Sequence, residues 1–332
     1  IQAIVVNSGN ANAATGQQGV DDAYRMQSLA AESMGLESNL VAVASTGVIG
    51  QPLPMEKIEA GIVNASGELG RDGSGFAEAV LTTDTRAKEA VVEIEVDGKR
   101  VTVGGTAKGS GMIHPNMGTM LAFLTTDAAV EPDCLQETLS RATDHSFNQV
   151  TVDGDTSPSD MALLLANGAA GNEPLTNDSP DYPAFAEAVE TVARELAKEI
   201  ARDGEGATKL VEVIVEGARD EETAAALAKS VVGSNLVKAA VFGEDANWGR
   251  VVTAMGYSGA AFDPSTLELS FGPVKVFEGG EPVPHDEAGA NAALSEDEVR
   301  ITAYLGEGDG SARAWGCDLT YQYVEINGSY RT

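Results

Sequence analysis

KGSGMIHPNMGTMLAFLTTD, residues 108–127, joins a glycine-rich polar loop to an apolar run with the character of a strand. The two parts meet at Gly118-Thr119, so we expect the Thr119 hydroxyl at the mouth of a buried strand, with the cation of Lys108 nearby. On these residues alone, a turn glycine followed by a strand threonine is the commoner explanation, because β-branched residues suit strands.

The same junction also suits a nucleophile that activates itself. A threonine hydroxyl needs a base beside it, and the α-amine of an N-terminal threonine, with a pKa of about 7.7–8.0, can be that base. This amine is freed only when the bond between Gly118 and Thr119 is cut. Gly118 has no Cβ, which permits the close approach that attack by Thr119 on the preceding carbonyl requires.

The stretch resembles the cleavage-site motif of the ornithine acetyltransferase (glutamate N-acetyltransferase) family, and the resemblance extends along nearly all 332 residues. It implies a precursor that cuts itself between Gly118 and Thr119 and then carries an acetyl group on Thr119. The predicted pieces are an N-terminal chain, 1–118, and a C-terminal chain, 119–332. Alanine more often precedes the threonine in this family, and the departure at Gly118 bears on the speed of cleavage.

A second motif ends the strand-like run at residues 40–44. Taken alone, residues 45–50 are best explained as an ordinary turn, although a glycine there lets backbone N–H groups face a cavity and hold an oxyanion. The family resemblance assigns the oxyanion hole to Thr46 and Gly47.

Other motifs match family positions that bind substrate. From the residues alone, Thr82 also suits a helix cap, and Lys108 also suits a solvated surface. Glu205, between two glycines, suits an exposed loop or a site for the ammonium group of an amino acid, a contact that strengthens away from water. The resemblance implies substrate contacts for Thr82, Lys108, Thr119, Glu205, Asn327 and Thr332.

Three further segments have mixed interpretations. NSGNAN at residues 7–12 resembles a family signature near the active site, and a tight strand-to-helix loop explains it equally well. The acidic stretch 153–160 lacks EF-hand spacing and its closing glutamate, so no metal is expected; its residues 158–161, PSDM, depart from the family's Thr-Asn-Asp-Thr. Trp248 is expected to be a packing anchor, whereas Arg250 has no assigned role.

Composition excludes several function classes. The chain has 51 acidic and 21 basic residues, a net charge of −30, so nucleic acid and anionic membranes are poor partners. The acids are dispersed, as in proteins adapted to high salt, and a halophilic source is expected. No apolar run approaches the ~20 residues of a membrane span, no signal segment is present, and the two cysteines form no CxxC. A cytoplasmic location follows by elimination.

Alternating strand and helix patterns predict an α/β fold with helices layered on sheets. Asp97-Gly98 predicts a hairpin turn, and apolar residues spaced three to four apart predict a long helix over 184–202. The aromatic tail, 320–332, is expected to dock on the protein rather than to be disordered. Because Ile1 lies inside a strand-like run, we expect the chain to be truncated at its N-terminus.

The predicted function is transfer of the acetyl group of N2-acetylornithine to glutamate, through an acetyl-threonine, in arginine biosynthesis. No cofactor is expected, with acetyl-CoA as an optional second acetyl donor. The family assembly is a heterotetramer with two copies of each piece. The alternatives are a self-processing aminopeptidase or amidase with an N-terminal threonine, and an amino-acid-binding protein without catalysis.

Overall fold

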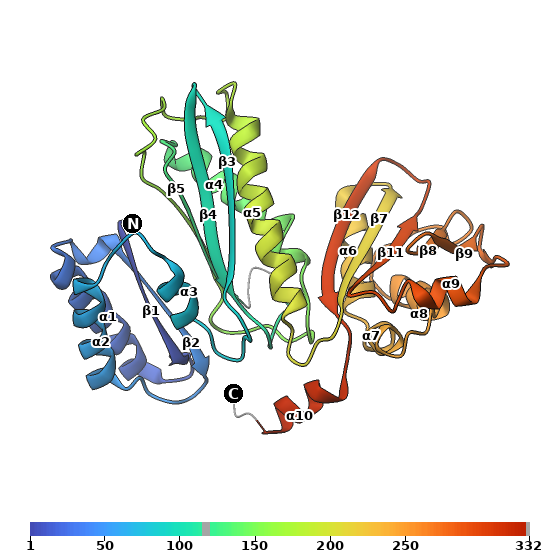
Figure 1. The fold of residues 1–332 in the computed structure, drawn as a ribbon, viewed down its shortest axis with the longest axis horizontal. Helices are drawn as coiled ribbons and strands as arrows, with labels where there is room; N and C mark the ends of the chain where they lie inside the picture. Colours follow the sequence, from blue (N-terminus) through green and yellow to red (C-terminus); the bar gives the residue numbers. More distant parts are fainter. Residues whose placement is uncertain (115–119, 330–332) are drawn as a thin grey trace.

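The computed structural model describes residues 1–114 and 120–329. Helices and strands alternate along the chain and form three lobes (Figure 1), which confirms the predicted α/β class. Within the described residues the strands make a two-stranded, a four-stranded and a six-stranded sheet.

The N-terminal lobe is a helix layer on a small parallel sheet. Strand β1 pairs with β2 along its whole length, and alternate side chains face opposite sides. Val5 and Val43 pack toward α1 and α2, whereas Ile4 and Ala44 face the neighbouring sheet. The elements are β1 (Ala3–Asn10), α1 (Gly16–Met34), β2 (Val41–Val48) and α2 (Met55–Gly67).

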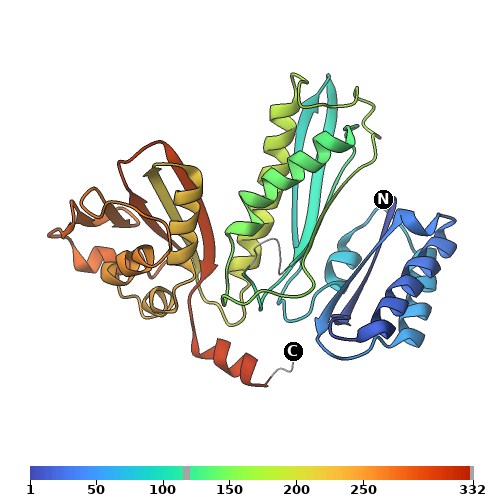
Figure 2. The same ribbon diagram turned by 180° about the vertical axis from the view of Figure 1, so that it is seen from behind.

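The central lobe has the order β3-β4-β5-β6. Helices α4 and α5 cover one face of this sheet (Figure 2), and Leu121 and Phe123 on the other face meet Ala44 of β2. Phe76 of α3 stacks edge-on against Phe123, with ring centroids 5.2 Å apart. The layers therefore run helix, sheet, sheet, helix. The elements are α3 (Ser74–Ala79), β3 (Lys88–Val96), β4 (Lys99–Lys108), β5 (Leu121–Thr126), α4 (Pro132–Asp144), β6 (Met161–Ala166) and α5 (Tyr182–Arg202).

The C-terminal lobe is a six-stranded mixed sheet with helices against one face. The chain then turns back through α10, which lies below the central lobe in Figure 1. The elements are β7 (Leu210–Ala218), α6 (Glu221–Val232), α7 (Asn235–Phe242), α8 (Trp248–Gly256), β8 (Glu268–Phe271), β9 (Val274–Glu278), β10 (Glu281–Pro282), α9 (Glu287–Ala292), β11 (Glu298–Tyr304), β12 (Gly310–Cys317) and α10 (Tyr321–Ser329).

Several segments with turn-like composition are strands, which corrects our prediction. Residues 7–10 and 45–48 continue β1 and β2, with Ser8 opposite Thr46 and Gly9 opposite Gly47. Residues 104–108, which lie beyond the hairpin strand expected to end at Val103, continue β4 and pair with both β3 and β5. The ladder hydrogen bonds outweigh the local turn preference of Gly, Ser and Asn.

No single helix within residues 1–114 and 120–329 is long and apolar enough to cross a membrane. Helices α6 and α7 are bent by 56° relative to each other. Taken together, they are long and apolar enough for a span, judged by length and composition only.

Candidate active site

Most of the predicted site residues line one pocket. Met120, which directly follows Thr119 in the chain, lines this pocket, as does Asp153. Gly118, Thr119 and Thr332 lie outside the described residues. The predicted site residues that line the pocket are Thr46, Gly47, Thr82, Lys108, Glu205 and Asn327.

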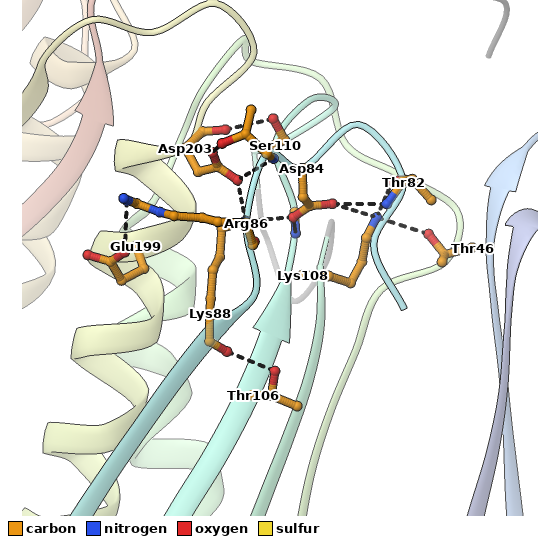
Figure 3. Close-up of polar contacts among 12 residues, drawn as sticks. Thr46, Thr82, Asp84, Arg86, Lys88, Thr106, Lys108, Ser110, Glu199 and Asp203 are labelled. Atoms are coloured by element: carbon orange, nitrogen blue, oxygen red, sulfur yellow. Dashed lines mark hydrogen bonds and ion pairs between the residues drawn. The ribbon is translucent and has the colours of Figure 1, made fainter. Parts of the chain in front are cut away.

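Lys108 connects two of the predicted threonines. It is the last residue of β4, and its Nζ donates hydrogen bonds to Thr46 Oγ1 at 3.1 Å and to Thr82 Oγ1 at 2.8 Å (Figure 3). Only 8% of its surface is exposed, so it is not a solvated surface lysine. Burial lowers the pKa of the Lys108 ammonium, and the charge of Asp84 opposes that effect.

Asp84 and Lys88 form a buried charge network beside Lys108. Lys88 Nζ lies 2.6 Å from Asp84 Oδ1 and 2.6 Å from Asp203 Oδ2, and Asp84 Oδ2 lies 4.0 Å from Lys108 Nζ. Burial tends to raise the pKa of Asp84, but the charges of Lys88 and Lys108 outweigh it, and the pKa is lowered overall. The motif that contains Thr82 therefore also supplies a carboxylate.

Gly47 allows β1 and β2 to come unusually close at the pocket. Its φ is +129°, and a Cβ on Gly47 would lie 2.3 Å from the carbonyl carbon of Gly9. Any other residue would push the two strands apart. Thr46 and Gly47 thus lie near the end of β2, where Thr46 contacts Lys108.

Glu205 is held from both sides. Its amide donates to Ser110 O at 3.0 Å, and its Oε2 accepts a 2.7 Å hydrogen bond from Asn327 Nδ2 in α10. The carboxylate packs on Gly111, where a Cβ would lie 2.3 Å from its carbon. Only 7% of Glu205 is exposed, so it is not a solvated loop residue.

The C-terminal helix is docked on the pocket by a second contact. Tyr323 OH donates to Asp153 Oδ2 at 3.3 Å, and Asp153 also accepts from the amides of Met112 and Ile113 at 2.7 and 2.9 Å. Burial, followed by the charge of Asp153, raises the pKa of Tyr323. The predicted docking of the tail agrees with these contacts.

Sequence reasoning missed four charged residues around the pocket. Asp84, Asp160 and Asp203 lie in motifs already singled out, beside Thr82, in the stretch 153–160 and beside Glu205, whereas nothing local marks Lys88. Both carboxylate oxygens of Asp160 are buried. Burial raises the pKa of Asp160 to about 7, against the opposing effects of the Met120 backbone and of Lys108.

Residues outside the pocket have structural roles. Trp248 packs against Phe277 with ring centroids 5.3 Å apart, as the prediction of a packing anchor requires. Arg250 donates to Leu236 O at 2.8 Å. Among the described residues, no group of three or more His, Cys, Asp and Glu side chains is arranged to hold a metal ion.

A family model described as "ArgJ family" matches residues 1–332. The chain belongs to the ArgJ family. The ArgJ protein of Symbiobacterium thermophilum, an "arginine biosynthesis bifunctional protein", is 59% identical over all of this chain and 83% of its own length. That of Geobacillus kaustophilus is 56% identical over all of this chain and 81% of its own. ArgJ membership confirms the predicted family, and with it an acyltransferase of arginine biosynthesis.

A solved ArgJ structure supports the fold. The crystal structure of the Bacillus halodurans protein matches with a TM-score of 0.63 and 49% sequence identity. The match covers 64% of this chain and the whole of that one.

Proposed function

We propose that this ArgJ protein transfers the acetyl group of N2-acetylornithine to glutamate through an ester on Thr119, after cutting itself between Gly118 and Thr119. One observation carries the proposal: Met120, covalently bonded to Thr119, lines the same pocket as Thr46, Gly47 and Lys108. Consecutive Cα atoms are about 3.8 Å apart, so the proposed nucleophile is tied to that pocket.

In the first half-reaction, the α-amine of Thr119 accepts the proton of its own hydroxyl. The oxygen attacks the acetyl carbonyl, and Thr46 and Gly47 hold the oxyanion that forms. The bond from carbon to ornithine nitrogen breaks, and the α-ammonium returns its proton to the departing amine. Acetyl-Thr119 and ornithine result.

In the second half-reaction, the amine of glutamate attacks the ester carbonyl in the same oxyanion hole. The α-amine of Thr119 takes the proton that the glutamate nitrogen loses and passes it to the Thr119 oxygen as the ester bond breaks, and N-acetylglutamate leaves. These steps use no cofactor, and a covalent intermediate of this kind produces ping-pong kinetics. Acetyl-CoA is a candidate second donor to the same hydroxyl.

Substrate charges match the pocket. Lys108 and Thr82 suit a substrate carboxylate, because an ammonium and a hydroxyl both donate hydrogen bonds. Glu205, oriented by Asn327, suits an ammonium group. Thr332 remains a predicted substrate contact.

The sheet explains how the two pieces would stay together after cleavage. β4, in the N-terminal piece, and β5, in the C-terminal piece, are paired from Lys108 and Leu121 onward. This pairing supports two associated pieces, for which we propose the heterotetramer of two copies of each.

The test is an acetyl-transfer assay on the wild type and Thr119→Ala. Thr125→Ala, on the exposed side of β5, is the matched control. We expect transfer to glutamate in the wild type and the control, and none in Thr119→Ala. Acetate formed at the same rate with and without glutamate would instead indicate an amidase.

A further inference from the structure

The hydrogen bonds of Lys108 fix the direction of two hydroxyl groups. An ammonium has donors only, so Thr46 Oγ1 and Thr82 Oγ1 must both accept from Lys108 Nζ. Each threonine then has its own proton left to donate elsewhere. A charged Lys108 therefore makes both hydroxyls donors toward the pocket that they line.

Asp84 contacts the backbone next to Lys108 and the backbone of Thr82. Its Oδ1 accepts from the amide of Gly109, directly after Lys108, at 2.7 Å, and its Oδ2 accepts from the amide of Thr82 at 3.2 Å. The same Oδ2 lies 4.0 Å from Lys108 Nζ. The Asp84 carboxylate thus holds the backbone amides of Gly109 and Thr82 in position. It also places a negative charge near the ammonium of Lys108.

We infer that Asp84 is a positioning residue of the acetyl transfer: it keeps Lys108 in place and charged, so that Thr46 donates to the oxyanion and Thr82 to the substrate. The inference rests on the proposed function, in which Thr46 belongs to the oxyanion hole. Among the described residues, Asp84 is not one of those that line the pocket.

The protonation of Lys108 decides whether the arrangement works. A neutral lysine has a lone pair and can accept a hydrogen bond from a threonine, which would withdraw that proton from the substrate. Burial favours the neutral form, and the nearby charge of Lys88 adds to it; Asp84 opposes both, with smaller help from Asp160 and Glu205. Removing Asp84 should therefore lower the pKa of Lys108.

Lys88 and Asp203 complete the support. Lys88 is fully buried between the two carboxylates, and Asp203 also accepts from the amide of Thr85 at 3.0 Å. This chain of contacts joins the segment after α3 to the end of α5 (Figure 3).

The experiment compares the pH dependence of kcat and KM for acetylornithine in the wild type, Asp84→Asn and Asp84→Glu. Glu199→Gln is the control, because it removes the exposed Arg86–Glu199 ion pair next to the network. The ionisation of the substrate is the same in all four proteins. Differences between their profiles therefore report on the protein.

We expect Asp84→Asn to move the alkaline limb of kcat to lower pH by about one unit or more, as the loss of a charge at this distance implies. At the wild-type optimum kcat should fall about tenfold, less than the 10²–10³ that loss of a whole oxyanion donor costs. KM should change less than kcat. Asp84→Glu should restore the limb, and Glu199→Gln should leave the profile unchanged.

An alkaline limb that stays in place in a folded Asp84→Asn would overturn the inference. If Asp84→Asn does not fold, Lys88→Met tests the same claim with the opposite sign, since loss of that charge should move the limb to higher pH; an unmoved limb would again refute it. The proposed function fails separately, if the wild type forms no acetyl-enzyme with acetylornithine.

Discussion

Asn327 Nδ2 in α10 donates a 2.7 Å hydrogen bond to Glu205 Oε2, across 122 residues of sequence. This contact brings the C-terminal helix to the pocket, although no residue of that helix is buried. The helix therefore contributes to the site by orienting a carboxylate rather than by packing a core.

Removal of this amide should weaken substrate binding. We expect Asn327→Ala to raise KM about tenfold with a smaller change in kcat, because hydrogen bonds to charged groups contribute about 1.5–3 kcal/mol. Steady-state kinetics with both substrates measures the change. Val324→Ala is the control. Val324 lies in the same helix and is 67% exposed, so this variant should behave as the wild type. Equal KM values in the two variants would argue against a role for Asn327.

Gly111 should tolerate no side chain. A Cβ there would lie 2.3–2.4 Å from the carboxylate of Glu205, so Gly111→Ala must displace that carboxylate. We expect a loss of kcat/KM of about tenfold or more, similar to the loss of a charged hydrogen bond, with nearly unchanged stability. Gly73→Ala meets nothing within 4 Å and is the control. Wild-type kinetics for Gly111→Ala would show that the position of Glu205 is unimportant.

Asp160 should make stability depend on pH. Its pKa is raised to about 7 from an ordinary 3.8, so the folded state holds a proton that the unfolded state has lost between those values. Wild-type stability therefore falls as pH rises through that window, and Asp160→Asn should escape this loss. The melting temperature of Asp160→Asn minus that of the wild type should therefore be several degrees larger at about pH 7.5 than at about pH 5.

The control for Asp160 is Asp155→Asn, exposed in the same loop. Its melting temperature relative to the wild type should be the same at both pH values. If Asp155→Asn and Asp160→Asn showed the same change in relative melting temperature between the two pH values, the pH dependence could not be assigned to the buried Asp160 carboxyl.

Glu212 should be a stability residue remote from the pocket. It is buried in β7, where its carboxylate lies 3.0 Å from Arg300 Nε and accepts from Trp315 Nε1 at 3.1 Å. Glu212→Ala leaves the buried indole without its acceptor, which should cost about 1–3 kcal/mol in the free energy of unfolding. Urea denaturation measures this, and Glu216→Ala, exposed on the same strand, should cost nothing measurable. Catalysis should be unaffected in both folded variants.

Local patterns in the sequence predicted the regular elements well. Asp97-Gly98 forms the predicted hairpin turn, with φ of +52° and +66°, and the apolar spacing over 184–202 corresponds to α5, which buries that face. The strand extensions at 45–48 and 104–108 were missed because their pairing partners lie far away in the chain. A window of glycine, serine and threonine carries no information about those partners.

The site was predicted unevenly for the same reason. Motifs led to Thr46, Thr82, Lys108, Glu205 and Asn327, which lie around one pocket, while their proposed roles stay predictions. Lys88 was missed, because its partner Asp203 is 115 residues away and neither residue belongs to a periodic pattern. Buried ion pairs of this kind become visible only in three dimensions.

Intact-mass spectrometry of the wild type and Thr119→Ala, before and after incubation with N2-acetylornithine, tests the central claim most directly. We predict two wild-type chains, residues 1–118 and 119–332, with one acetyl group added to the N-terminal residue of the second. Thr119→Ala should be one uncut chain without the adduct. A wild-type protein that stays uncut and still transfers acetyl groups to glutamate would contradict the account.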